Sequence, residues 1–396
     1  MDGGRSFGAV REGAPLAMRT GDAEPAVGPA GSLGVGLPAP SKEEIEHYLT
    51  ELLGRPARIA SVERLDRSEG GKGFGYGALL RLSLVGEARD LVLHRAGTRC
   101  FGHDTPADRA YDSLLAFESY GSLPRHVRAV DVGSIDAAGR MTSLRTARDF
   151  FFFTEYAEGH PYHRELAAAA GRDRPIPSEV EHAETLALLL ARLHQLRRRA
   201  PDLYKRRLRQ LVGGDECIAG TLDGYDGRDL RGYASPELLL AIEKRCVRWR
   251  RKLKVYTARL CRVHGDFHPW NILFQGDEPV LVDRSRGEWG EAADDVAALS
   301  INFVFFALVA KRHFTGAMVP LWERFFERYL EATGDMSLGE VIAPYFAWRA
   351  LVLASPVWYP AIDTSVRRRL FRFAARVLDE EPFDHRRIGL LLAEAG

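Results

Sequence analysis

Three polar residues in the second half of the chain have the types and spacing that phosphoryl transfer requires. Asp266 and Asn271 belong to the segment VHGDFHPWNILF, and Asp283 follows nine residues after its end. Such a site needs a carboxylate that orients and deprotonates an alcohol, together with oxygen ligands that hold Mg²⁺ against nucleotide phosphates. Asp266 can be this carboxylate, and Asn271 and Asp283 can be the metal ligands.

The residues between these positions predict a β-hairpin that returns Asp283 to the neighbourhood of Asn271. The apolar runs 272–274 and 279–282 are typical of two short strands, and residues 275–278 between them are typical of a turn. Asp and Asn also favour turns for local hydrogen-bonding reasons. Their joint spacing with Asp283 argues against a merely structural role.

This segment resembles the catalytic loop H-G-D-x-H-x-x-N of the aminoglycoside phosphotransferase and choline kinase group, relatives of the eukaryotic protein kinases. Every defined position is present, namely His264, Gly265, Asp266, His268 and Asn271. The resemblance implies that Asp266 and His268 are catalytic and that Asn271 is a metal ligand. His264 is expected to be a packed residue whose ring is hydrogen-bonded to the backbone.

The run that begins at Asp283 resembles the metal motif of the same group, D-F-[DE]-x-x-x-x-G-D-P-x-x-D-L-A. Gly290, Glu291 and Asp295-Val296-Ala297 keep the register, but Arg284 replaces the usual aromatic residue and Ser285 replaces a second carboxylate. The resemblance therefore implies one metal carboxylate, Asp283. Asp295 is expected to accept backbone N–H groups of the catalytic loop.

Two other classes of protein remain open. His264, Asp266 and His268 could be ligands of a metal-dependent hydrolase, because imidazole and carboxylate bind zinc and iron. The other histidines form no second cluster, and only the kinase interpretation explains Asn271, Asp283 and Asp295. The second class is a nucleotide-binding pseudokinase, suggested by His94 and Ser285.

The first part of the chain contains the elements that a nucleotide-binding lobe needs. A glycine-rich link that includes Gly70, Gly71, Lys72 and Gly73 would let backbone amides approach phosphates. In the strand that follows, His94 occupies the place of the family's phosphate-gripping Lys or Arg, and Arg95 comes next. The remaining positions that the resemblance assigns to nucleotide binding are Asp108, as the acid that pairs with the strand cation, and Glu155, Tyr156 and Ala157, as the hinge at the adenine.

Periodicity and capping signals predict the elements around these positions. The expected strands are 57–65, 76–85, 90–95, 127–132 and 150–156, and the expected helices are 41–54, 105–121, 184–196, 297–333, 338–353 and 364–378, with a helical insert over 200–260. The resemblance then implies an α+β, two-lobed, protein-kinase-like fold. Its parts would be a disordered tail (1–40), a nucleotide-binding lobe (41–156) and a helical lobe with the catalytic loop and the substrate site (157–396).

Composition narrows the partners. Lys and Arg total 55 against 54 for Asp and Glu, so no global charge indicates nucleic acid or an anionic membrane. The apolar run 301–310 is too short to span a bilayer and is expected to be a core helix. The four cysteines lack C-x-x-C spacing, which fits the cytoplasm. The expected partners are therefore a small hydroxyl-bearing substrate, ATP or GTP, and Mg²⁺.

The identity of the substrate stays open between three types. A polycationic aminoglycoside would need an acidic pocket, for which the candidates are Asp215, Glu216, Asp223, Asp226, Glu288 and Glu291. A choline-like ammonium would need an aromatic cage, for which the candidates are Tyr345, Phe346, Trp348, Trp358 and Tyr359. A sugar would need neither.

Overall fold

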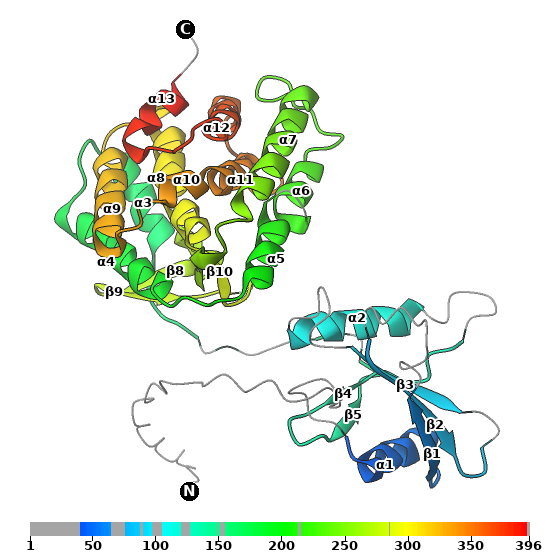
Figure 1. Ribbon diagram of the computed structural model, residues 1–396. Helices are drawn as coiled ribbons and strands as arrows, with labels where there is room; N and C mark the ends of the chain where they lie inside the picture. The colour runs from blue at the N-terminus through cyan, green and yellow to red at the C-terminus, as the bar shows by residue number, and fades with distance from the viewer. Residues whose placement is uncertain are drawn as a thin grey trace, which may run out of the picture. The chain divides into compact units, whose positions relative to one another are not determined.

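The computed structural model divides the chain into two compact units, Met1–Phe150 and Phe151–Gly396 (Figure 1). The sequence places the boundary slightly later, between Tyr156 and Ala157. The structure describes residues 40–64, 76–87, 90–96, 105–119, 127–147, 149–150, 154, 156–212, 215–284 and 286–393. The predicted tail and glycine-rich link lie outside these ranges, as do Glu155 and Ser285.

The first unit is built on an antiparallel sheet with the order β1-β2-β3. Its strands are β1 (Ile59–Arg64), β2 (Tyr76–Leu84) and β3 (Leu91–Ala96), close to the predicted bounds. Helix α1 (Lys42–Leu53) begins at the predicted cap, where the Ser41 side chain accepts a hydrogen bond from Glu44 N, and it ends at Gly54 with a positive φ. Ile45 and Leu49 of this helix pack with Leu82 and Leu84 of the sheet in a small core.

Helix α2 (Pro106–Ser119) has a capping box at its start. The Thr105 hydroxyl oxygen accepts a hydrogen bond from Asp108 N at 3.3 Å, and the Asp108 carboxylate accepts one from Thr105 N at 2.7 Å. Asp108 is therefore placed as a capping residue of α2. Its expected pairing with a strand cation stays a prediction.

The two later strands predicted for this part of the chain are wrong. Residues 127–132 have no regular structure, and no strand includes the described residues of 150–156. The chain instead forms a hairpin of β4 (Gly133–Ile135) and β5 (Met141–Ser143). The physical reason is local turn chemistry, because the Asp136 carboxylate accepts hydrogen bonds from Ala138 N and Arg140 N and closes the turn here.

The second unit is mostly helical. Its helices are α3 (Tyr162–Ala170), α4 (Pro177–His194), α5 (Pro201–Leu211), α6 (Asp215–Asp223), α7 (Pro236–Leu253), α8 (Ala292–Lys311), α9 (Met318–Thr333), α10 (Leu338–Val341), α11 (Ala343–Ala354), α12 (Thr364–Val377) and α13 (Ile388–Leu392), with short 3₁₀ turns η2 (Thr257–Arg259), η3 (Pro269–Asn271) and η4 (His385–Arg387). The predicted helical insert is present as α5, α6 and α7. Together the two units confirm the predicted α+β fold class.

Helix α8 forms the centre of this unit. It is buried from Ala292 to Leu308 and packs against α9, α11 and α3 (Figure 1). Within the described residues it is the one helix long and apolar enough to cross a membrane, but most of it is covered by its neighbours. Because burial of apolar surface is the main driving force of folding, α8 is a core helix, as its apolar run predicts.

Short strands position the loops at one end of the helical unit. Strand β7 (Leu260–Arg262) pairs with β10 (Trp289–Glu291), and β8 (Ile272–Gln275) pairs with β9 (Glu278–Leu281) and with β6 (His160–Pro161). The β8–β9 hairpin is the one that the sequence predicts. Its turn uses Gly276 at φ 60°.

Candidate active site

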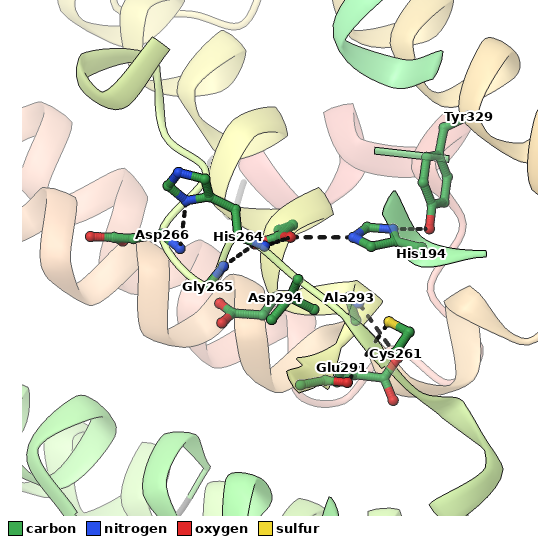
Figure 2. Close-up of polar contacts among 12 residues, drawn as sticks. His194, Cys261, His264, Gly265, Asp266, Glu291, Ala293, Asp294 and Tyr329 are labelled. Atoms are coloured by element: carbon green, nitrogen blue, oxygen red, sulfur yellow. Dashed lines mark hydrogen bonds and ion pairs between the residues drawn. The ribbon is translucent and has the colours of Figure 1, made fainter. Parts of the chain in front are cut away.

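The loop from His264 to Asn271 is held by a buried carboxylate of α8. Asp295 accepts hydrogen bonds from His264 N at 2.7 Å and Gly265 N at 2.8 Å, and its side chain also meets His194 Nε2 at 3.2 Å (Figure 2). Burial alone would raise the pKa of Asp295, but the contacts with His194 and the two amides lower it below its usual value. The carboxylate therefore stays ionised and fixes the start of the loop.

The histidine beside Asp295 has a structural role of its own. His194 is buried, and its Nδ1 lies 2.8 Å from the hydroxyl of Tyr329 on α9. The contacts at both ring nitrogens satisfy its hydrogen-bonding groups in the core. They connect α4, α8 and α9 beneath the catalytic loop.

Gly265 is needed for its conformation and for its small size. Its φ of 87° lies in the left-handed region, and a Cβ atom at this position would be 3.2 Å from Cβ of Arg286. A larger residue would be strained and would press on the next loop. The glycine thus allows the loop that follows β9 to lie directly against the catalytic loop.

The two predicted metal ligands lie next to each other through the β8–β9 hairpin. Val282 N donates a hydrogen bond to the Asn271 carbonyl oxygen at 3.0 Å, and Asp283 is the next residue. Asn271 Nδ2 donates to the Asp266 carbonyl oxygen at 3.0 Å, which leaves the amide oxygen as an acceptor. Asp283 is exposed and has a φ of 56°. A carboxylate and an amide oxygen at adjacent backbone positions fit a Mg²⁺ ion.

Asp266 lies at the centre of a buried ionic cluster that the sequence does not reveal. Its Oδ1 accepts a hydrogen bond from Arg349 Nη1 at 2.6 Å, and Arg286 Nη2 lies 3.6 Å from the same oxygen. Arg349, on α11, also donates through Nη2 to Asp294 Oδ1 at 2.9 Å. One guanidinium thus bridges the carboxylates of the catalytic loop and of α8.

Electrostatics divide these carboxyl groups. Burial would raise the pKa of Asp266, but Arg349 and Arg286 lower it below its ordinary value, so Asp266 is ionised at neutral pH. Burial raises the pKa of Asp294 to about 6 in spite of Arg349, and Asp295 adds to the increase. Burial would lower the pKa of Arg349, but the two carboxylates raise it, which keeps the guanidinium charged.

The two histidines of the loop make local contacts. His268 Nδ1 accepts a hydrogen bond from Trp270 N at 3.3 Å, and its Nε2 lies 3.6 Å from Asp266 Oδ2. Burial lowers the pKa of His268 to about 4, so the ring is neutral at pH 7. His264 Nδ1 accepts a hydrogen bond from Asp266 N at 3.3 Å, which is the kind of backbone contact that the sequence predicts for this ring.

Arg284 occupies the position where an aromatic residue is usual, and it fastens the metal-motif loop in another way. Its Nη2 and Nε donate to the Val263 carbonyl oxygen at 2.7 and 3.1 Å, and its Nη2 also reaches the Glu288 carbonyl oxygen at 3.3 Å. These hydrogen bonds join the loop after β9 to the segment before the catalytic loop. They replace the packing that an aromatic ring would provide.

The side chains considered for binding a cationic substrate have other partners. Glu291 accepts hydrogen bonds from Tyr204 and Arg259, and Glu288 pairs with Arg262 at 2.6 Å. Among the aromatic candidates, Tyr345, Phe346 and Trp348 are buried, and Trp358 is exposed. The ring of Trp348 is covered by the guanidiniums of Arg349 and Arg286, at 4.0 and 4.6 Å from its centre. A choline cage at Trp348 is therefore not formed.

The insert carries the other acidic candidates. Asp223 and Asp226 line a pocket of about 290 Å³ formed by α6, α7 and the segment between them. Glu216 is exposed, and the side chain of Asp215 lies outside the described residues.

No group of three His, Cys, Asp or Glu side chains within the described ranges is arranged to hold one metal ion. His264 directs Nδ1 to a backbone amide, and Arg349 occupies Asp266. The geometry gives no support to a hydrolase centre of His264, Asp266 and His268.

The expected nucleotide-binding positions of the first unit are described only in part. On β3, the Leu91 and Leu93 side chains pack on the core, and Arg95 shares their face, whereas His94 is exposed on the other face. Burial lowers the pKa of His94, so the imidazole is neutral at pH 7. Gly70, Gly71, Lys72, Gly73 and Glu155 lie outside the described residues. In the second unit Tyr156 is exposed and Ala157 is half-buried.

A small unit with an antiparallel sheet and a helical unit with this catalytic loop define a kinase-like phosphotransferase. The sequence over residues 84–345 matches the family described as "Phosphotransferase enzyme family". Because this match spans more than half of the chain, the protein belongs to that family, and the predicted resemblance is confirmed. No curated protein matches the sequence.

Solved structures of kinases also resemble the chain, at low identity. One is choline kinase from Cryptosporidium parvum Iowa II, with 13% identity, a TM-score of 0.33 and coverage of 81% of this chain and 89% of that chain. A second is a choline/ethanolamine kinase family protein from Mesorhizobium loti, with 14% identity, a TM-score of 0.35 and coverage of 88% and 99%. A third is a type I macrolide 2′-phosphotransferase, with 17% identity, a TM-score of 0.30 and coverage of 84% and 96%.

Proposed function

We propose that this phosphotransferase is a small-molecule kinase that transfers the γ-phosphoryl group of ATP or GTP to a substrate hydroxyl. The observation that carries the proposal is the junction of the catalytic loop with the β8–β9 hairpin. It places an ionised buried carboxylate, Asp266, on the same short loop as Asn271, beside which Asp283 follows. Phosphoryl transfer relies on this kind of positioning and charge stabilisation.

The contacts of Asp266 divide the work between its two oxygens. Oδ1 is held by Arg349 and approached by Arg286, whereas the nearest side chain printed for Oδ2 is His268, beyond hydrogen-bond distance. Oδ2 is thus the oxygen that would orient the substrate hydroxyl and accept its proton. A neutral His268 beside Oδ2 would support that carboxylate without adding a positive charge.

Asn271 and Asp283 would hold Mg²⁺ through the amide oxygen and the carboxylate. When bound, this ion would neutralise the phosphate oxygens of the nucleotide. The chain prepares the ligands in advance, because the hydrogen bond from Asn271 Nδ2 to the Asp266 carbonyl fixes the direction of the amide.

The proposed reaction predicts Mg²⁺-dependent formation of a phosphate ester. Incubation with ATP or GTP and a set of small alcohols, sugars and amino alcohols is expected to give one acceptor whose product has a new ³¹P resonance, with ADP or GDP formed in equal amount. Chelation with EDTA should abolish the reaction. Nucleotide hydrolysis at the same rate with and without every acceptor would argue for a hydrolase, and zinc or iron retained through dialysis would point the same way.

The cation that grips the α- and β-phosphates is proposed to be Arg95 or Lys72 rather than His94. A neutral imidazole would stabilise phosphate charge poorly, whereas guanidinium and ammonium groups stay charged. Arg95→Ala or Lys72→Ala is therefore expected to raise the KM for ATP by about tenfold, since a hydrogen bond to a charged group contributes on the order of 1.5–3 kcal/mol. His94→Ala should change it little. An increased KM in His94→Ala alone, with activity that climbs as pH falls through the imidazole range, would identify His94 as the grip.

A further inference from the structure

Arg286 is a cation beside the catalytic carboxylate that its own lobe only partly satisfies. Its Nη2 is 3.6 Å from Asp266 Oδ1, beyond hydrogen-bond distance, and its guanidinium stacks on Trp348. Its Nη1 is buried and has no hydrogen-bond partner among the residues that the structure describes. The side chain is 34% exposed, so a ligand can reach it.

The charges around Asp266 balance without a ligand. Asp266 and Asp294 carry two negative charges when both are ionised, and Arg349 and Arg286 carry two positive ones. Arg349 is committed to both carboxylates, so it cannot turn to a substrate without leaving one of them unpaired in the interior. Arg286 is therefore the cation that an acceptor substrate would meet at this place.

The same wall has further N–H groups that lack partners. Trp348 is 2% exposed, and its Nε1 has no hydrogen-bond acceptor within the described part of the chain; the same holds for Nε of the buried Arg349. Both residues belong to α11 and are neighbours in sequence. Buried donors without acceptors are costly, and each calls for an acceptor atom from a ligand or from water.

We infer that the acceptor substrate is an acidic hydroxy compound, whose carboxylate or phosphate group pairs with Arg286 while its hydroxyl meets Asp266. This inference rests on the proposed kinase function and specifies its substrate class. An ammonium group at the same place would face a guanidinium, and the acids that could attract a polycation, Glu288 and Glu291, are paired with arginines. Arg suits this role because its planar fork matches a carboxylate or phosphate.

The test compares three sugars of one ring type that differ in charge, namely glucuronate, glucose and glucosamine. Calorimetric titration of the Mg-ADP complex is expected to show glucuronate binding at least about tenfold more tightly than glucose, with glucosamine weakest. Arg286→Gln should bring glucuronate to the level of glucose, and Arg286→Lys should keep part of the preference. Arg324→Gln, at an arginine of α9 that pairs with Glu184, is the matched control and should leave the order unchanged.

Three results would overturn the inference: no binding of glucuronate, binding of glucosamine equal to or tighter than that of glucuronate, or an unchanged preference in Arg286→Gln. A repeat with Mg-AMP-PNP distinguishes the source of the anion. Glucuronate that binds with ADP but is excluded by AMP-PNP would show that Arg286 serves the γ-phosphoryl group, and this result also contradicts the inference. The kinase proposal fails separately, by lack of Mg²⁺-dependent AMP-PNP binding, and the sugars can still be titrated against the nucleotide-free protein.

Discussion

An Arg349→Met protein is expected to lose about 3–5 kcal/mol of its free energy of unfolding at pH 8, measured by urea denaturation, because two buried carboxylates would lose their shared counter-ion. Arg349 is 5% exposed and lies 2.6 Å from Asp266 and 2.9 Å from Asp294. Methionine fills a similar volume but supplies neither charge nor donors. The loss comes from the carboxylates left behind rather than from the ion pairs as such.

The matched control is Arg324→Met, which removes an arginine of α9 that pairs with Glu184 while its own side chain is 49% exposed. Exposed pairs contribute about 0–1 kcal/mol, so this variant should unfold nearly as the parent does. Equal destabilisation of the two variants would show that Arg349 carries no special burden. Replacing Asp294 by Asn in the Arg349→Met protein should restore part of the lost stability.

The loss in Arg349→Met should also depend on pH. The pKa of Asp294 is raised by burial to about 6 in the folded protein, above its unfolded value, so folding favours the protonated carboxyl. Its contribution to stability is present at low pH and declines as the pH rises through about 6. Without the guanidinium, this carboxyl would take up its proton more readily still. The destabilisation of Arg349→Met is therefore expected to be smaller at pH 5 than at pH 8.

The parts of the site that depend on short-range signals can be predicted from the sequence. The spacing of Asp266 and Asn271, the two apolar runs and the turn between them place the catalytic loop and the hairpin correctly, because a two-residue turn leaves few alternatives. Helix α1 is predicted to within a residue from its cap and its terminal glycine. Local rules are sufficient where neighbouring residues determine the structure.

The ionic cluster depends on contacts that no local rule describes. Arg349 is 83 residues from Asp266 in sequence and belongs to a helix that otherwise reads as apolar core. One signal was available, because a charged residue within an apolar helical run must have a partner in the interior. That signal predicts a pair but cannot name the carboxylates, since the packing of α11 against α8 determines them.

The incorrect strands 127–132 and 150–156 have a different cause. Their apolar residues were taken as strand signals, whereas Val127, Val130, Phe150 and Tyr156 are exposed. The stronger signal was the turn at Asp136 and Gly139, which places the pairing residues at 133–135 and 141–143.

Asp266→Asn is expected to lower the rate of phosphoryl transfer by about 10²- to 10⁴-fold, the usual contribution of a general base. The amide can still accept a hydrogen bond from Arg349, which preserves the cluster better than alanine would. Binding of the Mg²⁺–nucleotide complex should change little, because this side chain is not a proposed metal ligand. Acceptor-dependent ADP release gives the rate, and an unchanged melting temperature would exclude a damaged fold.

Calorimetric titration with ATP, with and without Mg²⁺, tests the assignment of base and metal ligand most directly. We expect the parent and Asp266→Asn to bind the Mg²⁺ complex with similar affinity, and Asp283→Ala to lose most of the Mg²⁺-dependent part while it remains folded. Binding by Asp283→Ala that matches the parent, with the same gain from Mg²⁺, would contradict the central claim that Asp283 holds the metal beside the carboxylate that accepts the substrate proton.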